Sequence, residues 1–228
     1  MDGVQAIGFV AKRLGPLLDR VTFLGGATVG LLATDSGGAP PRPTKDVDVI
    51  VEATSWLDYA QLRKPLMSLG FREAVDEKVI CRWSLDEVKV DIMPVEGAIL
   101  GFNSQWYRAA ADEAVDHLLP DGTTIKLISP ACFLATKLDA FGDRGRGDYQ
   151  ASSDIDDLVS VIDGRSSIVD DVRSASREVR TYVAHEMARH LNTPAFVDGL
   201  AGQLHPDPAS QKRLPLIMKR INEIAFVP

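Results

Sequence analysis

Two aspartates, Asp46 and Asp48, open the segment 46–52 (DVDVIVE), in which acidic and apolar residues alternate. Side chains two residues apart on a strand leave the same face, so both carboxylates are expected on one side of the strand. Neighbouring carboxylates raise each other's pKa unless a cation lies between them. Mg²⁺ prefers such oxygen ligands and usually takes one or two carboxylates together with substrate phosphates. The pair therefore predicts either a divalent-metal site or a charged strand edge that deters aggregation.

A third aspartate, Asp91, lies in the segment 88–93 (VKVDIM) and alternates with valine and isoleucine in the same way. If the two strands are neighbours, three carboxylates converge on one patch, as in two-metal sites that clamp the attacking and leaving oxygens. Upstream, Gly25 and Gly26 lie between a strand-like run and an expected helix. Small residues there let the backbone approach a phosphate, and a helix N-terminus attracts an anion. The ordered set of glycines and aspartates predicts a site for metal and phosphate.

An alternation of helices and short strands is expected to position these residues. The pair Asp86-Glu87 predicts a hairpin turn between two strands. The whole order predicts an α+β fold, a mixed sheet with flanking helices followed by a helical C-terminal region. We expect a core domain over 1–127 and a helical domain over 128–228. The expected strands are 21–24, 46–52, 71–74, 79–85, 88–93, 115–119 and 123–127, and the expected helices are 4–20 with a break at Gly15-Pro16, 27–33, 56–69, 130–141, 153–163, 167–190 and 209–224.

Composition excludes several classes of protein. The 228 residues are 45% hydrophobic and 25% charged, which is typical of a globular chain with a sizeable core. The net charge of -7 gives no chain-wide basic footprint for nucleic acid. Cys81 and Cys132 form no CxxC motif, so a disulfide framework or cysteine-rich zinc site is not expected. No uncharged apolar stretch is long enough for a membrane span, and we expect a cytoplasmic protein without a membrane partner.

The series GG…DxD…D resembles the nucleotidyltransferase superfamily, whose fold is that of DNA polymerase beta, poly(A) polymerase and antibiotic nucleotidyltransferases. The segment 133–165 (FLATKLDAFGDRGRGDYQASSDIDDLVSVIDGR) is similar to a narrower group, the AbiEii/MenT-type nucleotidyltransferase toxins of bacterial type IV toxin–antitoxin systems. That resemblance covers about residues 20–165. It implies a nucleotidyltransferase-type sheet, and a site completed by Lys137 on one helix and Asp154 at the start of the next.

The chain departs from the family pattern beside the glycines. Ala27 stands where the family usually has serine or threonine, and Thr28 follows one place later, so a phosphate-binding hydroxyl comes from Thr28 or is absent. A Gly/Pro-rich loop over 34–44 lengthens the spacing to Asp46. Its Arg42 and the adjacent Lys45 could reach a triphosphate, or the loop is a tolerated insertion.

The second segment leaves alternatives open when its residues are considered alone. Lys137 lies beside the apolar stripe of its helix, where it could extend to solvent or point into a cleft toward phosphates. Arg144 could contact phosphate or acceptor, or be a solvated charge. Asp154 and Asp157 share a helical face and could hold Lys137 or Arg144 in place.

The resemblance implies Mg²⁺- or Mn²⁺-dependent transfer of a nucleoside monophosphate from an NTP to an acceptor hydroxyl. In this hypothesis Asp46, Asp48 and Asp91 hold the ions, and Asp91 also orients or deprotonates the acceptor. Gly25, Gly26 and Thr28 would cradle the triphosphate, with Lys45, Lys137 and Arg144 neutralising it. A toxin-like enzyme would act on tRNA or another RNA and could have an antitoxin partner. The acidic balance favours a small-molecule acceptor, and Ala27 favours a non-catalytic nucleotide-binding module.

The segment 185–190 (HEMARH) does not fit a metalloprotease. His185 and His190 are five residues apart, whereas the HExxH motif needs histidines four apart on one helical face. We expect both to be surface histidines.

Overall fold

The computed structural model describes residues 1–35, 37–38, 40–44, 46–74, 80–101 and 105–228. The chain forms two compact units. Unit 1 comprises Met1–Thr28 and Pro43–Ile128, and unit 2 comprises Val29–Arg42 and Ser129–Pro228. The segment Val29–Arg42, which the sequence analysis placed in the first domain, therefore belongs to unit 2.

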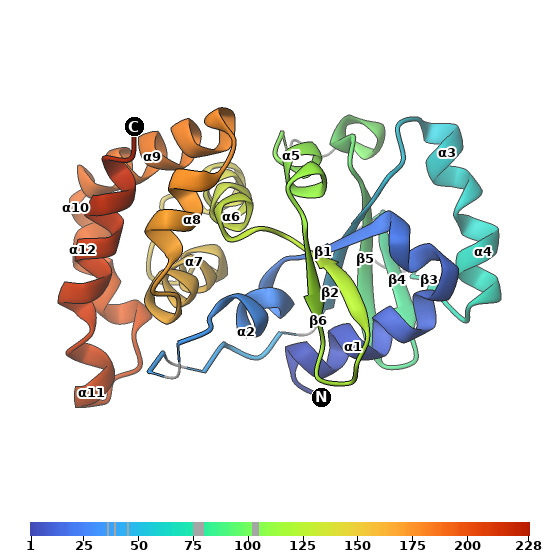
Figure 1. Cartoon of the computed structure of the whole chain (residues 1–228), viewed down its shortest axis with the longest axis horizontal. Coiled ribbons are helices and arrows are strands. Elements are labelled where there is room, and N and C mark those ends of the chain that lie inside the picture. The colour runs from blue at the N-terminus through green and yellow to red at the C-terminus, as the bar shows by residue number, and fades with distance from the viewer. Residues whose placement is uncertain (36, 39, 45, 75–79, 102–104) are drawn as a thin grey trace. The chain divides into compact units, whose positions relative to one another are not determined.

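Unit 1 contains a mixed sheet of seven strands in the order β3-β4-β5-β2-β1-β7-β6. Strands β2 and β5 are parallel, as are β1 and β7, while the remaining neighbours are antiparallel. The α+β class with a mixed sheet and flanking helices is as predicted (Figure 1). The strands are β1 (Val21–Leu24), β2 (Asp46–Val51), β3 (Arg72–Glu73), β4 (Arg82–Leu85), β5 (Val88–Pro94), β6 (Val115–Leu118) and β7 (Thr124–Leu127).

Local sequence signals set the ends of the helices of unit 1. The first helix is capped at its N-terminus by Asp2, whose carboxylate forms a capping box with the Gln5 side chain, and it ends at Leu14, before Gly15 with φ 50°. The predicted helix over 56–69 is two helices, because Pro65 lacks the N–H that a continuous helix would need there. The helical elements are α1 (Gly3–Leu14), η1 (Gly15–Arg20), η2 (Gly26–Thr28), α3 (Trp56–Gln61), α4 (Arg63–Ser68), η3 (Gly97–Leu100) and α5 (Tyr107–Asp112).

In the central strands β2 and β5 of unit 1, one face is apolar and buried, and the other combines Asp46, Asp48 and Asp91 with the buried Ile50 and Met93. Val47 and Val49 of β2 are at most 1% exposed, as are Val90 and Ile92 of β5. Burying each such side chain contributes about 1.5–3 kcal/mol, so this face fixes which residues of β2 and β5 point away from the core. The acidic residues occupy the alternate positions.

Unit 2 is helical. The predicted helix over 167–190 is divided at Ser176, which caps a new helix by accepting a hydrogen bond from Val179 N. Near the C-terminus a helix begins at Leu214, because Pro215 is tolerated only in a first turn. No helix in the described part of the chain is long and apolar enough to span a bilayer. The helical elements are α2 (Val29–Leu32), α6 (Pro130–Arg144), α7 (Ser153–Gly164), α8 (Ile168–Ser174), α9 (Arg177–Leu191), α10 (Pro194–Gly199), η4 (Leu200–Gln203), α11 (Pro208–Gln211) and α12 (Leu214–Ala225).

Within the segment Val29–Arg42, Asp35 makes polar contacts with α7 and α12. Asp35 N donates to Gly164 O at 2.7 Å, and its carboxylate pairs with Arg220 at 3.3 Å. A Cβ on Gly164 would lie 2.6 Å from the Ala33 Cβ, so the glycine permits this close approach. These contacts explain why the segment departs from the predicted domain division.

His190 corrects one prediction, since it is buried rather than on the surface. Its Nδ1 lies 2.8 Å from the Tyr149 hydroxyl, and its ring packs against Phe141 and Phe196. Burial and the charge of Arg189 lower the pKa of His190 to about 4, so the ring is neutral at pH 7. It is a packing residue of the helical unit.

Candidate active site

The sheet of unit 1 brings three carboxylates onto one face. Strands β2 and β5 are parallel neighbours in which Asp48 is the register partner of Asp91. Asp46 is two residues before Asp48 and therefore shares its face. Asp91 is buried, whereas Asp46 and Asp48 are half-buried. We call Asp46, Asp48 and Asp91 the acid triad.

A guanidinium lies against the acid triad. Arg82 of β4 is the register partner of Asp91 across the antiparallel pair β4–β5. Its Nε and Nη2 donate to the two oxygens of Asp91, each at 2.7 Å, and Nη2 also donates to Asp46 Oδ2 at 3.1 Å. The two side chains are only 15% and 10% exposed, so this bidentate pair is shielded from solvent. Arg82 thus neutralises part of the negative charge that the three aspartates bring together.

The glycine turn makes room for Asp48. Gly25 follows β1 with φ 74°, a conformation that side chains disfavour. A Cβ there would lie 1.9 Å from Asp48 Oδ2, so the carboxylate packs directly over the glycine backbone. Gly25 therefore permits both the turn and the position of the Asp48 carboxylate.

The residues after the turn differ from the expected phosphate-binding helix. Gly26 begins the three-residue η2, and α2 has only four residues, so the predicted helix over 27–33 is divided and has little macrodipole. Thr28 is fully buried, and its hydroxyl donates to Gly25 O at 2.8 Å. In this structure the Thr28 hydroxyl closes the turn.

The acid triad has the donor chemistry for a hard divalent cation. As the side chains stand, no group of three or more His, Cys, Asp or Glu within the described residues is arranged to hold a metal. The three carboxylates nevertheless lie on one face, and two of them, Asp46 and Asp91, accept hydrogen bonds from the Arg82 guanidinium. Oxygen ligands of this kind suit Mg²⁺ or Mn²⁺. The donor chemistry therefore suits such a metal, whereas the present arrangement, with Arg82 bonded to Asp46 and Asp91, does not form a set of metal ligands.

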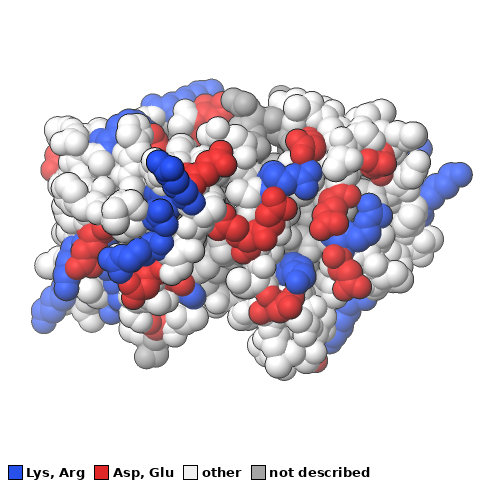
Figure 2. Space-filling view, turned by 45° about the horizontal axis from the view of Figure 1, so that its top comes forward, with Lys and Arg blue, Asp and Glu red and all other residues white. Residues whose placement is uncertain are grey.

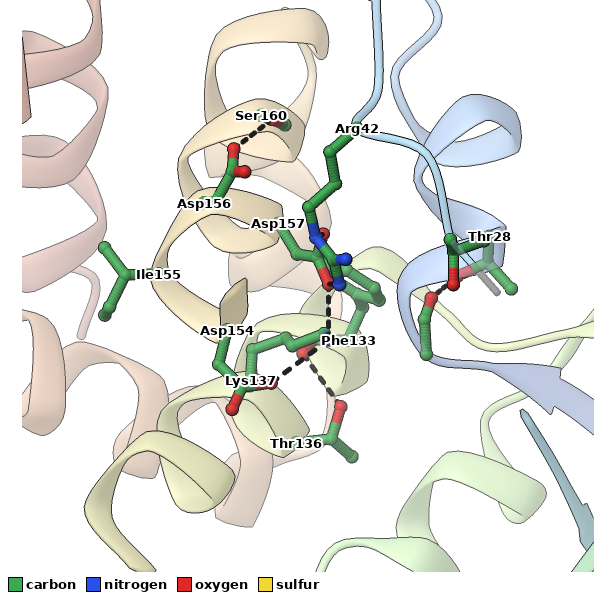
Figure 3. A network of polar contacts seen from close by, with 12 residues as sticks. Thr28, Arg42, Phe133, Thr136, Lys137, Asp154, Ile155, Asp156, Asp157 and Ser160 are labelled. Carbon is green, nitrogen blue, oxygen red and sulfur yellow. Dashed lines mark hydrogen bonds and ion pairs between the residues drawn. The ribbon is translucent and has the colours of Figure 1, made fainter. Parts of the chain in front are cut away.

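A second cluster of charges lies within unit 2 and includes Lys137 (Figure 3). Lys137 of α6 is 7% exposed, and its Nζ donates to Asp154 Oδ1 at 3.2 Å and to Asp157 Oδ2 at 2.6 Å. Both aspartates belong to α7 and are at most 3% exposed. The lysine points toward α7 in Figure 3, in agreement with these contacts.

Two arginines add to this cluster. Arg42 donates from Nε and Nη2 to the two oxygens of Asp157, at 2.8 and 3.0 Å. Arg144 donates to the two oxygens of Asp154, at 2.9 and 2.8 Å. Burial would raise the pKa of Asp154, but the hydrogen bonds of Arg144 and the charge of Lys137 outweigh it, so that pKa is lowered. The contacts support a role for Asp154 and Asp157 in holding Lys137, Arg42 and Arg144.

The structure divides the predicted site residues between the two units. Unit 1 contains Gly25, Gly26, Thr28, Asp46, Asp48 and Asp91, and unit 2 contains Lys137, Arg144 and Asp154. Lys45, predicted to bind nucleotide, lies outside the described residues.

The sequence analysis missed Arg82, although a signal for it exists. The predicted turn at Asp86-Glu87 pairs Leu85 with Val88, and counting back along the hairpin places Arg82 opposite Asp91. The partner of Arg42 carried no such signal, because Asp157 is 115 residues away in sequence.

Charge is mixed on the face of the molecule that Figure 2 draws. Figure 2 shows Lys and Arg side chains interspersed with Asp and Glu over the face that it draws. That face therefore lacks a broad basic patch of the kind that tracks a nucleic-acid backbone.

The chain matches no protein-family model, and no curated protein matches it.

The first prediction concerns the turn beneath Asp48. Gly25→Ala should lower the free energy of unfolding by about 3 kcal/mol or more, because it adds a clash with Asp48 to an unfavourable φ. Gly122→Ala is the matched control, since Gly122 has φ 86° and no atom within 4 Å of an added Cβ. Its loss should be about 1–2 kcal/mol. Urea unfolding of both variants measures the difference, and equal losses would show that Asp48 does not press on the turn.

The second prediction concerns the pH dependence of the Lys137 cluster. Because the pKa of Asp154 is lowered on folding, its stabilisation is present above about pH 4 and is lost as the pH falls through the folded-state pKa. Asp154→Asn should reduce the free energy of unfolding by about 3 kcal/mol at pH 7, and this difference should shrink toward pH 3.

Asp170→Asn serves as the control for this measurement, because Asp170 forms an exposed ion pair with Arg173. It should change stability by less than about 1 kcal/mol at either pH. An Asp154→Asn difference that stays constant between pH 7 and pH 3 would contradict the assignment.

Proposed function

We propose that the chain is a divalent-metal-dependent nucleotidyltransferase that moves a nucleoside monophosphate from an NTP to an acceptor hydroxyl. The observation that carries the proposal is the acid triad, with Asp48 and Asp91 in register on parallel strands and Asp48 packed over Gly25. The order of the glycines and aspartates, which resembles the nucleotidyltransferase superfamily, supports the same chemistry.

The acid triad would hold Mg²⁺ or Mn²⁺, which supplies positive charge for the triphosphate and the departing pyrophosphate. Asp91 would orient the acceptor hydroxyl and accept its proton at a carboxylate oxygen. The acceptor oxygen then bonds to the α-phosphorus as the bond to the β-phosphate bridging oxygen breaks, and pyrophosphate leaves. Gly26 would let the triphosphate approach the backbone, whereas Gly25 makes room for Asp48. The protein's contribution is mainly positioning and electrostatic stabilisation.

The family resemblance assigns Lys137 and Asp154 to the same reaction. In unit 2 Lys137 is bonded to two aspartates, so its charge is largely balanced within the cluster. Arg144, whose side chain is 68% exposed, is the more accessible cation for a phosphate. The proposal therefore rests on the acid triad and not on the Lys137 cluster.

The proposed acceptor is tRNA or another RNA, as for a toxin-like enzyme with an antitoxin partner. A small-molecule acceptor is the second candidate, and the net charge of -7 favours it because an RNA backbone prefers a basic groove. A non-catalytic nucleotide-binding module is the third, and the Arg82 guanidinium bonded to two aspartates of the acid triad favours it.

Incubation with labelled NTPs, Mg²⁺ and either total tRNA or low-mass hydroxyl compounds tests these candidates. The wild-type protein should release pyrophosphate and label RNA, whereas label on a low-mass acceptor alone would select the second candidate. Asp48→Asn should slow transfer by about a hundredfold or more, because it removes charge that is needed where the phosphates react.

Asp116→Asn is the matched control, since Asp116 lies on β6 and its side chain is 68% exposed in a pair with Lys126. It should transfer at the wild-type rate. Nucleotide binding without pyrophosphate release from any NTP, or Asp48→Asn as active as the wild type, would refute catalysis.

A further inference from the structure

The contacts of Arg82 use the oxygens that a metal would need. Both oxygens of Asp91 accept from Arg82. Asp46 Oδ2 accepts from the same guanidinium, while Asp46 Oδ1 accepts from the Thr44 hydroxyl at 3.1 Å. A divalent cation that binds these carboxylates therefore meets a positive charge already in place.

The position of Arg82 is built into the sheet. The hairpin β4–β5 sets Arg82 opposite Asp91, and the parallel pair β2–β5 sets Asp91 beside Asp48. Arg82, Asp91 and Asp48 thus form one row across three neighbouring strands. The side chain of Arg82 is flexible, so the guanidinium can rotate away from Asp91. The backbone of Arg82 stays beside the carboxylates, because the register of the strands fixes it.

We propose that Arg82 is an internal counter-ion of the acid triad that a divalent cation must displace from Asp91. The inference rests on the proposed function for the presence of a metal at this site. In the metal-free protein the guanidinium allows the carboxylates to stay close together. Metal binding is then an exchange of cations, so Arg82 lowers the affinity of the site for metal alone. A triphosphate, which offers the released guanidinium new anionic partners, strengthens metal binding.

A purely structural ion pair makes a different prediction. Removing a structural arginine weakens the fold and disorders the carboxylates, so metal binding weakens or stays the same. Removing a competing cation strengthens metal binding even if the metal-free fold becomes less stable.

A titration of the protein with Mn²⁺ in the absence of nucleotide separates the two roles. The electron paramagnetic resonance signal of the free ion measures how much Mn²⁺ remains unbound. Arg82→Gln should bind Mn²⁺ about tenfold more tightly than the wild type, because a nearby positive charge is removed. Arg82→Lys keeps the charge without the bidentate contact, so it should fall between them. Asp48→Asn should weaken binding in every background, which assigns the measured site to the acid triad.

Arg63→Gln is the matched control. Arg63 also makes a bidentate pair, with the carboxylate of Glu73 at 2.6 and 2.8 Å, and its side chain is 61% exposed. It should leave Mn²⁺ affinity at the wild-type value. Equal or weaker binding by Arg82→Gln, or no Mn²⁺ binding by either protein, would overturn the inference.

A measurement on the wild-type protein covers the case in which Arg82→Gln does not fold. The Nε–H resonance of Arg82, assigned by its loss in Arg82→Lys, should shift as Mg²⁺ is added. A resonance that stays unchanged while Mg²⁺ binds at the acid triad would overturn the displacement.

These results are distinguishable from those of the transfer assay. Nucleotide transfer by the wild type without tighter Mn²⁺ binding by Arg82→Gln would refute the counter-ion and leave the proposed function intact. The predicted exchange without transfer from any NTP would refute the function and leave the counter-ion intact.

Discussion

Charge balance at the acid triad is the constraint on which the rest of unit 1 depends. The sheet order places Asp48 and Asp91 on adjacent strands, and the alternation of β2 adds Asp46 to the same face. Ionised carboxylates at such spacing repel unless a cation shares them. In the structure the guanidinium of Arg82 supplies that positive charge to Asp46 and Asp91.

Unit 2 also balances a cluster of charges, but there the central charge is a cation and its partners are carboxylates. There, the buried Lys137 is surrounded by Asp154 and Asp157, and arginines on their outer sides complete the pairing. A buried charge left without its partner is costly, so each cluster also holds its backbone segments in place. Arg42 shows the effect, because its pair with Asp157 attaches the end of the segment Val29–Arg42 to α7 within unit 2.

The sequence predicted the elements of the fold better than their partners. Alternation revealed β2 and β5, and the glycine pair marked the turn beneath Asp48, because these patterns are local. The cap at Ser176 and the proline at 215 were local signals too, and they explain why two predicted helices proved shorter. Long-range pairs such as Arg42 with Asp157 depend on how helices pack, which no local pattern encodes. The burial of His190 was missed for the same reason.

Anomalous diffraction from crystals saturated with Mn²⁺ would test most directly whether the acid triad is a cation site. We expect an anomalous peak beside the carboxylates of Asp46, Asp48 and Asp91, with the Arg82 guanidinium no longer bonded to Asp91. A structure without such a peak, in which Arg82 still donates to both oxygens of Asp91, would contradict the metal-dependent chemistry proposed for this face of the sheet.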